Sequence, residues 1–299
     1  MPPREKLRGV VGYPVTPLKA GGTKLDEDRF CTMLDILIES GVCGQTIIGS
    51  TGSFGSFAEE ERKTIAAIAA GHINGRVRVF IGIGATATDE AIRLAKHAQD
   101  VGAAGVQVAA MMHWPLTESE LYTYYSAIAA AVSISVVVHN VPALSGMDLQ
   151  PPLLARLAQI ENVVCFKEGS GDLARVSRLK HLTDRDIEIW HDQDATALQG
   201  LAAGADVWAP VVSALLPDRC VELYELAVTK KDFSAARRLF DRMFPVIDFV
   251  TKKGAVRALH TAFELLGNPV GSPRPPLQLL DGDDRKELDT LLSQSGFFN

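Results

Sequence analysis

The chain has 299 residues, of which 47% are hydrophobic, and its formal net charge at pH 7 is −6. No stretch is rich in lysine and arginine, so we expect neither nucleic acid nor an anionic membrane as a partner. The sequence has no run of about 18 apolar residues and no apolar signal core at its N-terminus, which predicts a soluble, cytoplasmic protein.

Strand-like and helix-like stretches alternate along the first three quarters of the chain. Eight short apolar segments predict strands, at residues 9–13, 44–49, 77–82, 105–110, 135–139, 163–167, 187–190 and 206–210. Helix starts between them are marked by Asp26 and by capping-box spacings at 56–59 and 117–120. Eight repeats of a buried strand and a capped helix predict an α/β fold, a (β/α)8 TIM barrel over residues 1–225. An open doubly wound sheet is disfavoured, because Tyr13-Pro14-Val15-Thr16-Pro17 follows the first strand instead of a Gly-x-Gly-x-x-Gly turn.

The last quarter, residues 226–299, has only helical patterns. They cover residues 233–250, 255–266 and 283–292, and prolines separate the last two. No flexible linker precedes this part. We therefore expect a C-terminal helical segment that packs on the barrel within one structural unit.

Lys167 stands at the end of a predicted strand that reads as buried on both faces. An unpaired ammonium is costly to bury, so such a position favours a neutral amine, which can form an imine with a carbonyl substrate. The alternatives are a lysine that extends to solvent or that pairs with Glu168.

Other polar groups are expected at the same end of the barrel, where βα loops begin. Gly49-Ser50-Thr51-Gly52-Ser53 follows the second strand and offers N–H groups and hydroxyls for a carboxylate. His139 ends the fifth strand and Trp208 the eighth. Taken singly, the turn could cap a helix and His139 could be a core histidine. Together with Lys167 they predict a site for a 2-oxo acid.

The sequence resembles the dihydrodipicolinate synthase/N-acetylneuraminate lyase family of class I, pyruvate-type aldolases. The resemblance rests on Val15-Thr16-Pro17, Gly49-Ser50-Thr51-Gly52, Gly82-Ile83-Gly84-Ala85, Asn140-Val141-Pro142, Phe166-Lys167-Glu168-Gly169-Ser170-Gly171 and Asp194-Ala195-Thr196-Ala197-Leu198. It implies a homotetramer and a Schiff base on Lys167. It also implies that Ser50 and Thr51 hold the substrate carboxylate and relay protons, and we expect Gly49 of the same turn to bind substrate with them.

Several residues depart from the pattern of that family. His139 replaces the tyrosine that acts as general acid and base, and imidazole can do the same work. Met111-Met112-His113-Trp114-Pro115 lacks the tyrosine of the synthases, and Ala143-Leu144-Ser145-Gly146 lacks their entrance arginine. Trp208 is larger than the usual aliphatic residue, and we expect it to contact substrate. The substrate is therefore expected to be less polar than aspartate semialdehyde.

The prediction is a Schiff-base-forming lyase, an aldolase or a dehydratase, that acts through Lys167 on pyruvate or a 3-deoxy-2-oxo acid. His139 and Ser50 complete the predicted catalytic residues, with no metal and no cofactor. The alternatives are a true dihydrodipicolinate synthase and a pseudoenzyme that binds a 2-oxo acid. His191-Asp192-Gln193-Asp194 is the one candidate metal cluster, and we interpret it as a solvated loop in which Asp194 caps the next helix.

Overall fold

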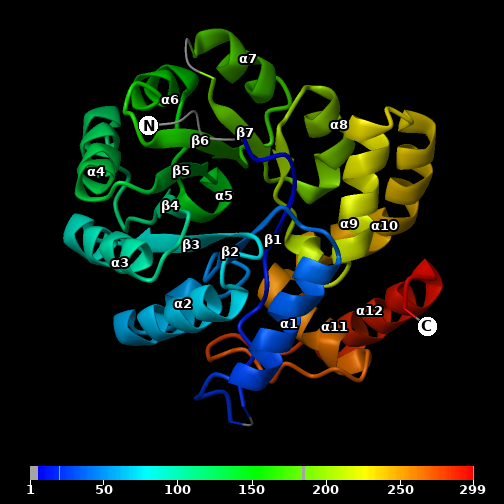
Figure 1. Cartoon of the computed structure of the whole chain (residues 1–299). Helices are drawn as coiled ribbons and strands as arrows, with labels where there is room; N and C mark the ends of the chain where they lie inside the picture. Colours follow the sequence, from blue (N-terminus) through cyan, green and yellow to red (C-terminus); the bar gives the residue numbers. More distant parts are fainter. Residues whose placement is uncertain (1–5, 20, 184–185, 299) are drawn as a thin grey trace.

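Eight strands form a closed parallel barrel in the computed structural model, which describes residues 6–19, 21–183 and 186–298 (Figure 1). Each strand pairs with the next, and β1 closes the barrel on β8. The strands are β1 Gly9–Gly12, β2 Gly44–Ile47, β3 Arg78–Ala85, β4 Gly105–Ala110, β5 Ser135–Asn140, β6 Val163–Glu168, β7 Glu188–His191 and β8 Val207–Trp208. The predicted TIM barrel is confirmed. Residues 1 and 299, the outer limits of the predicted parts, lie outside the described ranges.

Helices cover the outside of the barrel. They are α1 Glu27–Glu39, α2 Glu59–Ile73, α3 Thr88–Asp100, α4 Glu118–Ala131, α5 Pro142–Ser145, α6 Pro151–Leu157, α7 Arg175–Leu182, α8 Ala197–Ala202, α9 Pro217–Tyr224, α10 Phe233–Lys253, α11 Ala255–Leu265 and α12 Gly282–Ser295. Short 3-10 turns are η1 Phe54–Ser56, η2 Asp194–Thr196 and η3 Val211–Ala214, and a π-helical turn is η4 Glu225–Thr229.

Two of the three predicted helix starts are confirmed. Asp26 accepts a hydrogen bond from the Arg29 N–H, and Thr117 forms a capping box with Glu120. The capping box expected at 56–59 is wrong, because α2 begins at Glu59 after Ala58, and Glu61 accepts from the Ala58 N–H instead.

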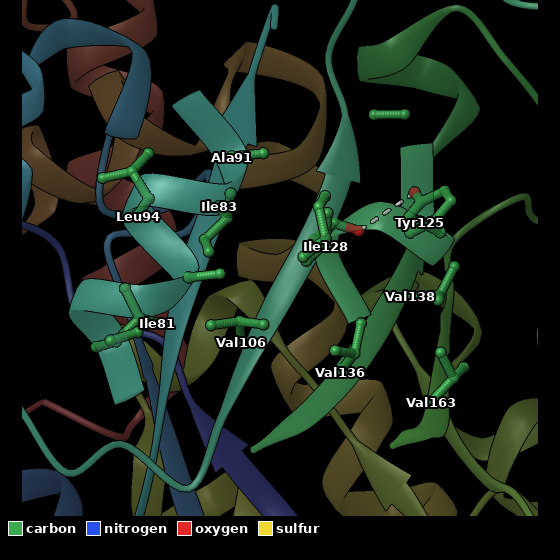
Figure 2. Packing of buried hydrophobic residues seen from close by; sticks show 14 of the residues in the cluster. Ile81, Ile83, Ala91, Leu94, Val106, Tyr125, Ile128, Val136, Val138 and Val163 are labelled. Carbon is green, nitrogen blue, oxygen red and sulfur yellow. Dashed lines mark hydrogen bonds between the residues drawn. The ribbon is translucent and has the colours of Figure 1, made fainter. Parts of the chain in front are cut away.

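Side chains alternate between the barrel interior and the helical layer along each strand. Inside, the Phe80 ring meets the Trp190 ring edge to face, with centroids 5.0 Å apart. Outside β3, β4 and β5, aliphatic residues of the strands pack against α3 and α4 (Figure 2). A filled interior below the carboxyl ends of the strands supports the polar groups that lie there.

The C-terminal helices pack beside β1 and β8 (Figure 1). A single apolar cluster joins Val10 and Trp208 of the barrel with α9, α10, α11 and α12. The division at residues 225 and 226 stays a prediction. In the described part of the chain, no helix has both the length and the apolar character needed to cross a membrane.

Candidate active site

Strands β5 and β6 bring His139 and Lys167 together. The two residues are register partners in neighbouring parallel strands, and both are buried, with 3% and 4% of their surfaces exposed. Their successors Asn140 and Glu168 are also register partners, and strand alternation turns these away from the barrel axis.

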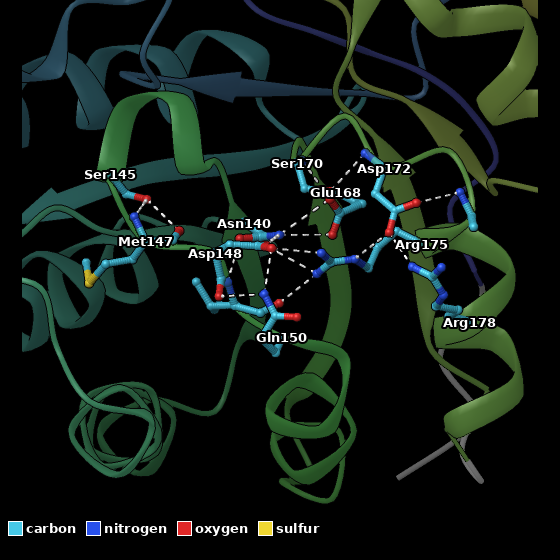
Figure 3. Close-up of polar contacts among 12 residues, drawn as sticks. Asn140, Ser145, Met147, Asp148, Gln150, Glu168, Ser170, Asp172, Arg175 and Arg178 are labelled. Carbon is cyan, nitrogen blue, oxygen red and sulfur yellow. Dashed lines mark hydrogen bonds and ion pairs between the residues drawn. The ribbon is translucent and has the colours of Figure 1, made fainter.

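A polar network outside the barrel fixes the ends of these two strands (Figure 3). The Asn140 side-chain amide donates to Glu168 at 3.1 Å and to Asp148 at 2.9 Å. Arg175, on α7, is buried and donates to Asp148 at 2.8 Å. Burial raises the pKa of the Glu168 carboxyl. Glu168 is thus part of a supporting network and is not the partner of Lys167.

The partner of Lys167 is Asp192, which directly follows β7. The Lys167 Nζ lies 2.7 Å from one Asp192 oxygen, and His139 Nε2 lies 2.7 Å from the other. The Asp192 side chain is only 9% exposed. The expectation of an unpaired lysine is therefore wrong, since a buried carboxylate compensates the ammonium charge.

Burial and neighbouring charges both shift the pKa values of Asp192 and His139. Burial alone would raise the pKa of Asp192, but Lys167 and His139 outweigh it and lower the pKa to about 2. Burial lowers the pKa of His139 below 6.5, and the positive charge of Lys167 lowers it further against the opposing effect of Asp192. At neutral pH the site therefore holds a carboxylate and an uncharged imidazole.

Two more residues of this site were not predicted from the sequence. The Tyr13 ring lies under Lys167, with Nζ 4.3 Å from the ring centroid. The Tyr13 hydroxyl donates to Gln107 Oε1 at 2.8 Å, and Gln107 Nε2 lies 3.4 Å from His139 Nδ1. Both residues come from inward-facing positions, Tyr13 just after β1 and Gln107 within β4.

The predicted carboxylate turn lies beside the same residues. Gly49, Ser50, Phe54, Gln107 and His139 are among the residues that line one pocket, and Thr51 is buried in the same turn. The backbone has positive φ at Ile48 and at Ser53, 55° and 58°, which is a strained conformation for residues with side chains.

Glycines in β3 let this turn approach the sheet. A Cβ atom at Gly84 would lie 2.3 Å from the Phe54 ring, and one at Gly82 would lie 2.4 Å from the Ile48 carbonyl oxygen. The Thr16 hydroxyl donates to the Gly52 carbonyl at 2.8 Å, which ties the turn to the segment after β1. The turn therefore requires a hydroxyl at Thr16 and residues without a side chain at Gly82 and Gly84.

Trp208 does not belong to this site. Its side chain is fully buried between the barrel and the helices, together with Val10, Val212 and Cys220. The neighbouring Val207 and Ala209 face the interior instead. The expected substrate contact of Trp208 is wrong, because strand alternation directs this residue outward.

The segment from His191 to Asp194 is not a solvated loop, because His191 and Asp194 are buried and Asp192 and Gln193 are only partly exposed. Asp194 accepts from the N–H groups of Val211 and Val212 at 3.2 and 2.9 Å, so it caps η3 and not the helix that follows it. Burial raises the pKa of Asp194 to about 7. Among the described residues, no group of three or more histidine, cysteine, aspartate or glutamate side chains is arranged to hold a metal ion.

Comparison with known proteins places the chain in one family. The sequence model described as "Dihydrodipicolinate synthetase family" matches residues 6–295. The chain belongs to this family. A 4-hydroxy-tetrahydrodipicolinate synthase of Kosmotoga olearia is 35% identical over 81% of this chain and 82% of that protein. One of Rhodopseudomonas palustris is 31% identical over 98% of both chains.

A solved structure of the family agrees with the same fold. YagE, a prophage protein of Escherichia coli K12 solved in complex with pyruvate, is 29% identical, and its TM-score is 0.90 over 96% of this chain and 98% of that chain. The predicted enzyme class, a Schiff-base-forming lyase that acts on a 2-oxo acid, is confirmed by these relationships.

Proposed function

We propose that Lys167 forms an imine with the C2 carbonyl of a 2-oxo acid and that His139 transfers the protons. The observation that carries this proposal is the buried group in which Asp192 bridges Lys167 and His139 with two 2.7 Å contacts. An amine, a base and a fixed negative charge are the groups that imine chemistry needs in one place.

His139 is the base in this mechanism. Asp192, with a pKa of about 2, is too weak a base to take a proton from Lys167 at neutral pH. The uncharged imidazole takes that proton, and the neutral amine attacks C2. The imidazolium then returns the proton to the departing hydroxyl, so that one water leaves and a positively charged imine remains.

The imine then acts as an electron sink. In an aldol cleavage, His139 removes a proton from the C4 hydroxyl, and the electrons of the C3–C4 bond move into the imine. In a dehydration, it removes a proton from C3 and returns it to the C4 hydroxyl, which leaves as water. Asp192 pairs the positive imine nitrogen until electrons move into it, as it pairs the Lys167 side chain of the free enzyme.

The substrate carboxylate is assigned to the turn at residues 49–51. Gly49 and Ser50 line the pocket beside His139, and a turn of this kind can present N–H groups and hydroxyls to an anion. Within the part of the chain that the structure describes, the residues lining this pocket include no arginine or lysine. Since Ala143-Leu144-Ser145-Gly146 also carries no cation where the synthases have an entrance arginine, we propose a substrate whose distal end carries no second carboxylate.

The test is borohydride trapping with pyruvate, read by intact-mass spectrometry. We expect one reduced pyruvate per chain in the parent protein and none in Lys167→Ala. Lys286→Ala, a change at an exposed lysine, is the matched control and should trap normally. Unmodified, folded parent protein would refute the assignment of a simple pyruvate imine.

A second assay separates the lyase from a synthase, the activity that the names of the relatives state. Enzyme that forms the trapped pyruvate adduct is incubated with pyruvate and aspartate semialdehyde. In a separate reaction it is incubated with a set of 3-deoxy-2-oxo acids whose distal end is uncharged. We expect turnover of the second set. Faster consumption of aspartate semialdehyde would favour the synthase.

We also propose a homotetramer and a cytoplasmic location. The tetramer rests on the family resemblance, and light scattering of the purified protein tests it. The location is supported by Cys31, Cys43 and Cys220, which form no disulfide.

A further inference from the structure

Five side chains close a ring of contacts across the mouth of the barrel. The order is Tyr13, Gln107, His139, Asp192 and Lys167, and the last contact returns from Lys167 to the face of the Tyr13 ring. They come from positions in or just after β1, β4, β5, β7 and β6. In such a ring the hydrogen position on one member fixes the hydrogen positions on the next.

The hydrogen positions follow from chemistry. Asp192 is ionised and can only accept, so His139 Nε2 carries a proton. A neutral imidazole has one N–H, and its Nδ1 is therefore an acceptor that faces the Gln107 amide at 3.4 Å. Gln107 must present its NH2 group there, which leaves its carbonyl oxygen for the Tyr13 hydroxyl at 2.8 Å.

Tyr13 is suited to hold that orientation. Burial, helped by the charge of Asp192, raises the pKa of the Tyr13 phenol well above 10, so the hydroxyl keeps its hydrogen at all working pH values. Thr46 lies 3.5 Å from the same Gln107 oxygen and can also donate to it. A carbonyl that faces hydroxyl donors keeps the NH2 group directed at His139.

We propose that Gln107, oriented by Tyr13, is a positioning residue that keeps the His139 proton on Nε2 and keeps Nδ1 unprotonated in the resting enzyme. The assignment of His139 as the base rests on the proposed function, but the tautomer does not. Protonation of Nδ1 would set an N–H against the Gln107 NH2, so proton uptake by His139 requires the amide to turn over.

The charged and titratable groups that face His139 are consistent with this arrangement. Asp192 faces Nε2, and Lys167 stands on the neighbouring strand beyond it. Tyr13 lies behind Gln107, and both Gln107 and Thr46 are neutral. No anion faces Nδ1 among the described contacts of the ring. A carboxylate placed at residue 107 would therefore strongly perturb the protonation of His139.

The test is nuclear magnetic resonance of the ligand-free protein with ring-15N-labelled histidine. We expect His139 to carry its proton on Nε2 at neutral pH, with Nδ1 unprotonated. In Gln107→Glu the new carboxylate favours an N–H at Nδ1, so the doubly protonated fraction of His139 should be larger than in the parent protein at the same pH. The protonation midpoint should rise by about one pH unit or more, a tenfold change in the equilibrium.

Tyr13→Phe is a second variant, which removes the hydroxyl group and keeps the ring. Without the Tyr13 hydroxyl the Gln107 oxygen keeps only the longer 3.5 Å contact with Thr46, so the amide turns more easily and the Nδ1–H signal of His139 should rise above the parent level. His191, which lies 3.1 Å from Thr196 and outside the ring, is the internal control whose signals should stay unchanged.

Two results would overturn the proposal. One is a parent protein in which His139 carries its proton on Nδ1. The other is a protonation midpoint that does not move in Gln107→Glu. Failure of pyruvate trapping would refute the proposed function and leave these spectra unaffected, so the two failures are distinguishable.

Discussion

Replacing Asp192 by asparagine tests the buried ion pair most directly. Asparagine keeps the shape of the side chain and an oxygen that can accept from His139, but it removes the charge that faces Lys167. The Lys167 and Asp192 side chains are 5% and 9% exposed, so solvent cannot replace the lost partner. At 2.7 Å the gross attraction between the two charges is about 6 kcal/mol for an effective dielectric constant of about 20.

The net effect is smaller, because burial of each charge has its own cost. Breaking a buried pair by removing one partner typically costs about 3–5 kcal/mol. We expect that loss in the free energy of unfolding for Asp192→Asn, and a similar loss for Lys167→Met. The double variant leaves no unpaired charge, so its cost should fall short of the sum by about 2 kcal/mol or more.

The assay is urea unfolding of the four proteins at pH 7, followed by circular dichroism. Lys253 and Asp284 form a matched control pair with the same 2.7 Å distance, but with side chains that are 35% and 42% exposed. The corresponding cycle at that pair should show no measurable coupling. If the costs of Asp192→Asn and Lys167→Met simply add to within about 0.5 kcal/mol, the reasoning about burial is wrong.

Three further predictions concern the base, the acid limit of stability and the turn. His139→Asn should lower kcat by about 10²–10⁴-fold. Pyruvate trapping on Lys167 should still occur on long incubation, and unchanged steady-state kinetics would remove His139 from the mechanism. The pKa of Asp192 is about 2 in the folded protein, below its value of 3.8 as a free group, so the unfolded chain binds the proton first as the pH falls. The stability that Asp192 contributes is complete above about pH 4 and should disappear between about pH 4 and pH 2, which unfolding at successive pH values would measure against Asp192→Asn. Gly84→Ala forces a Cβ to within 2.3 Å of Phe54. It should destabilise the protein by about 1–3 kcal/mol and raise KM for the 2-oxo acid. Gly71→Ala, which meets open space on α2, should do neither.

The barrel could be predicted from the sequence because its signals are local. Each strand is a short apolar run, and the Asp26 and Thr117 caps mark helix starts within a few residues. Lys167 and His139 could also be predicted from the sequence. Both end predicted strands, and neighbouring parallel strands place such residues side by side.

Asp192 and Gln107 were harder to predict, because their roles depend on contacts across the barrel. Asp192 sits in a run of polar residues that resembles a solvated loop, yet closure of the barrel covers it. Gln107 did leave a signal, a lone polar residue within the apolar strand 105–110. Alternation along β8 would similarly have turned Trp208 outward once Val207 and Ala209 were assigned to the interior.

The presence of Asp192 and Gln107 beside His139 can be explained by comparing imidazole with phenol as a base. A phenol has one oxygen and needs no partner to choose which atom holds the proton. Imidazole has two nitrogens, and its usefulness depends on which one is protonated. His139 meets an acceptor, Asp192, on one side and a donor, Gln107, on the other. A histidine at this position therefore requires both neighbours, and His139→Tyr alone would leave Asp192 and Gln107 arranged for a ring that is no longer there.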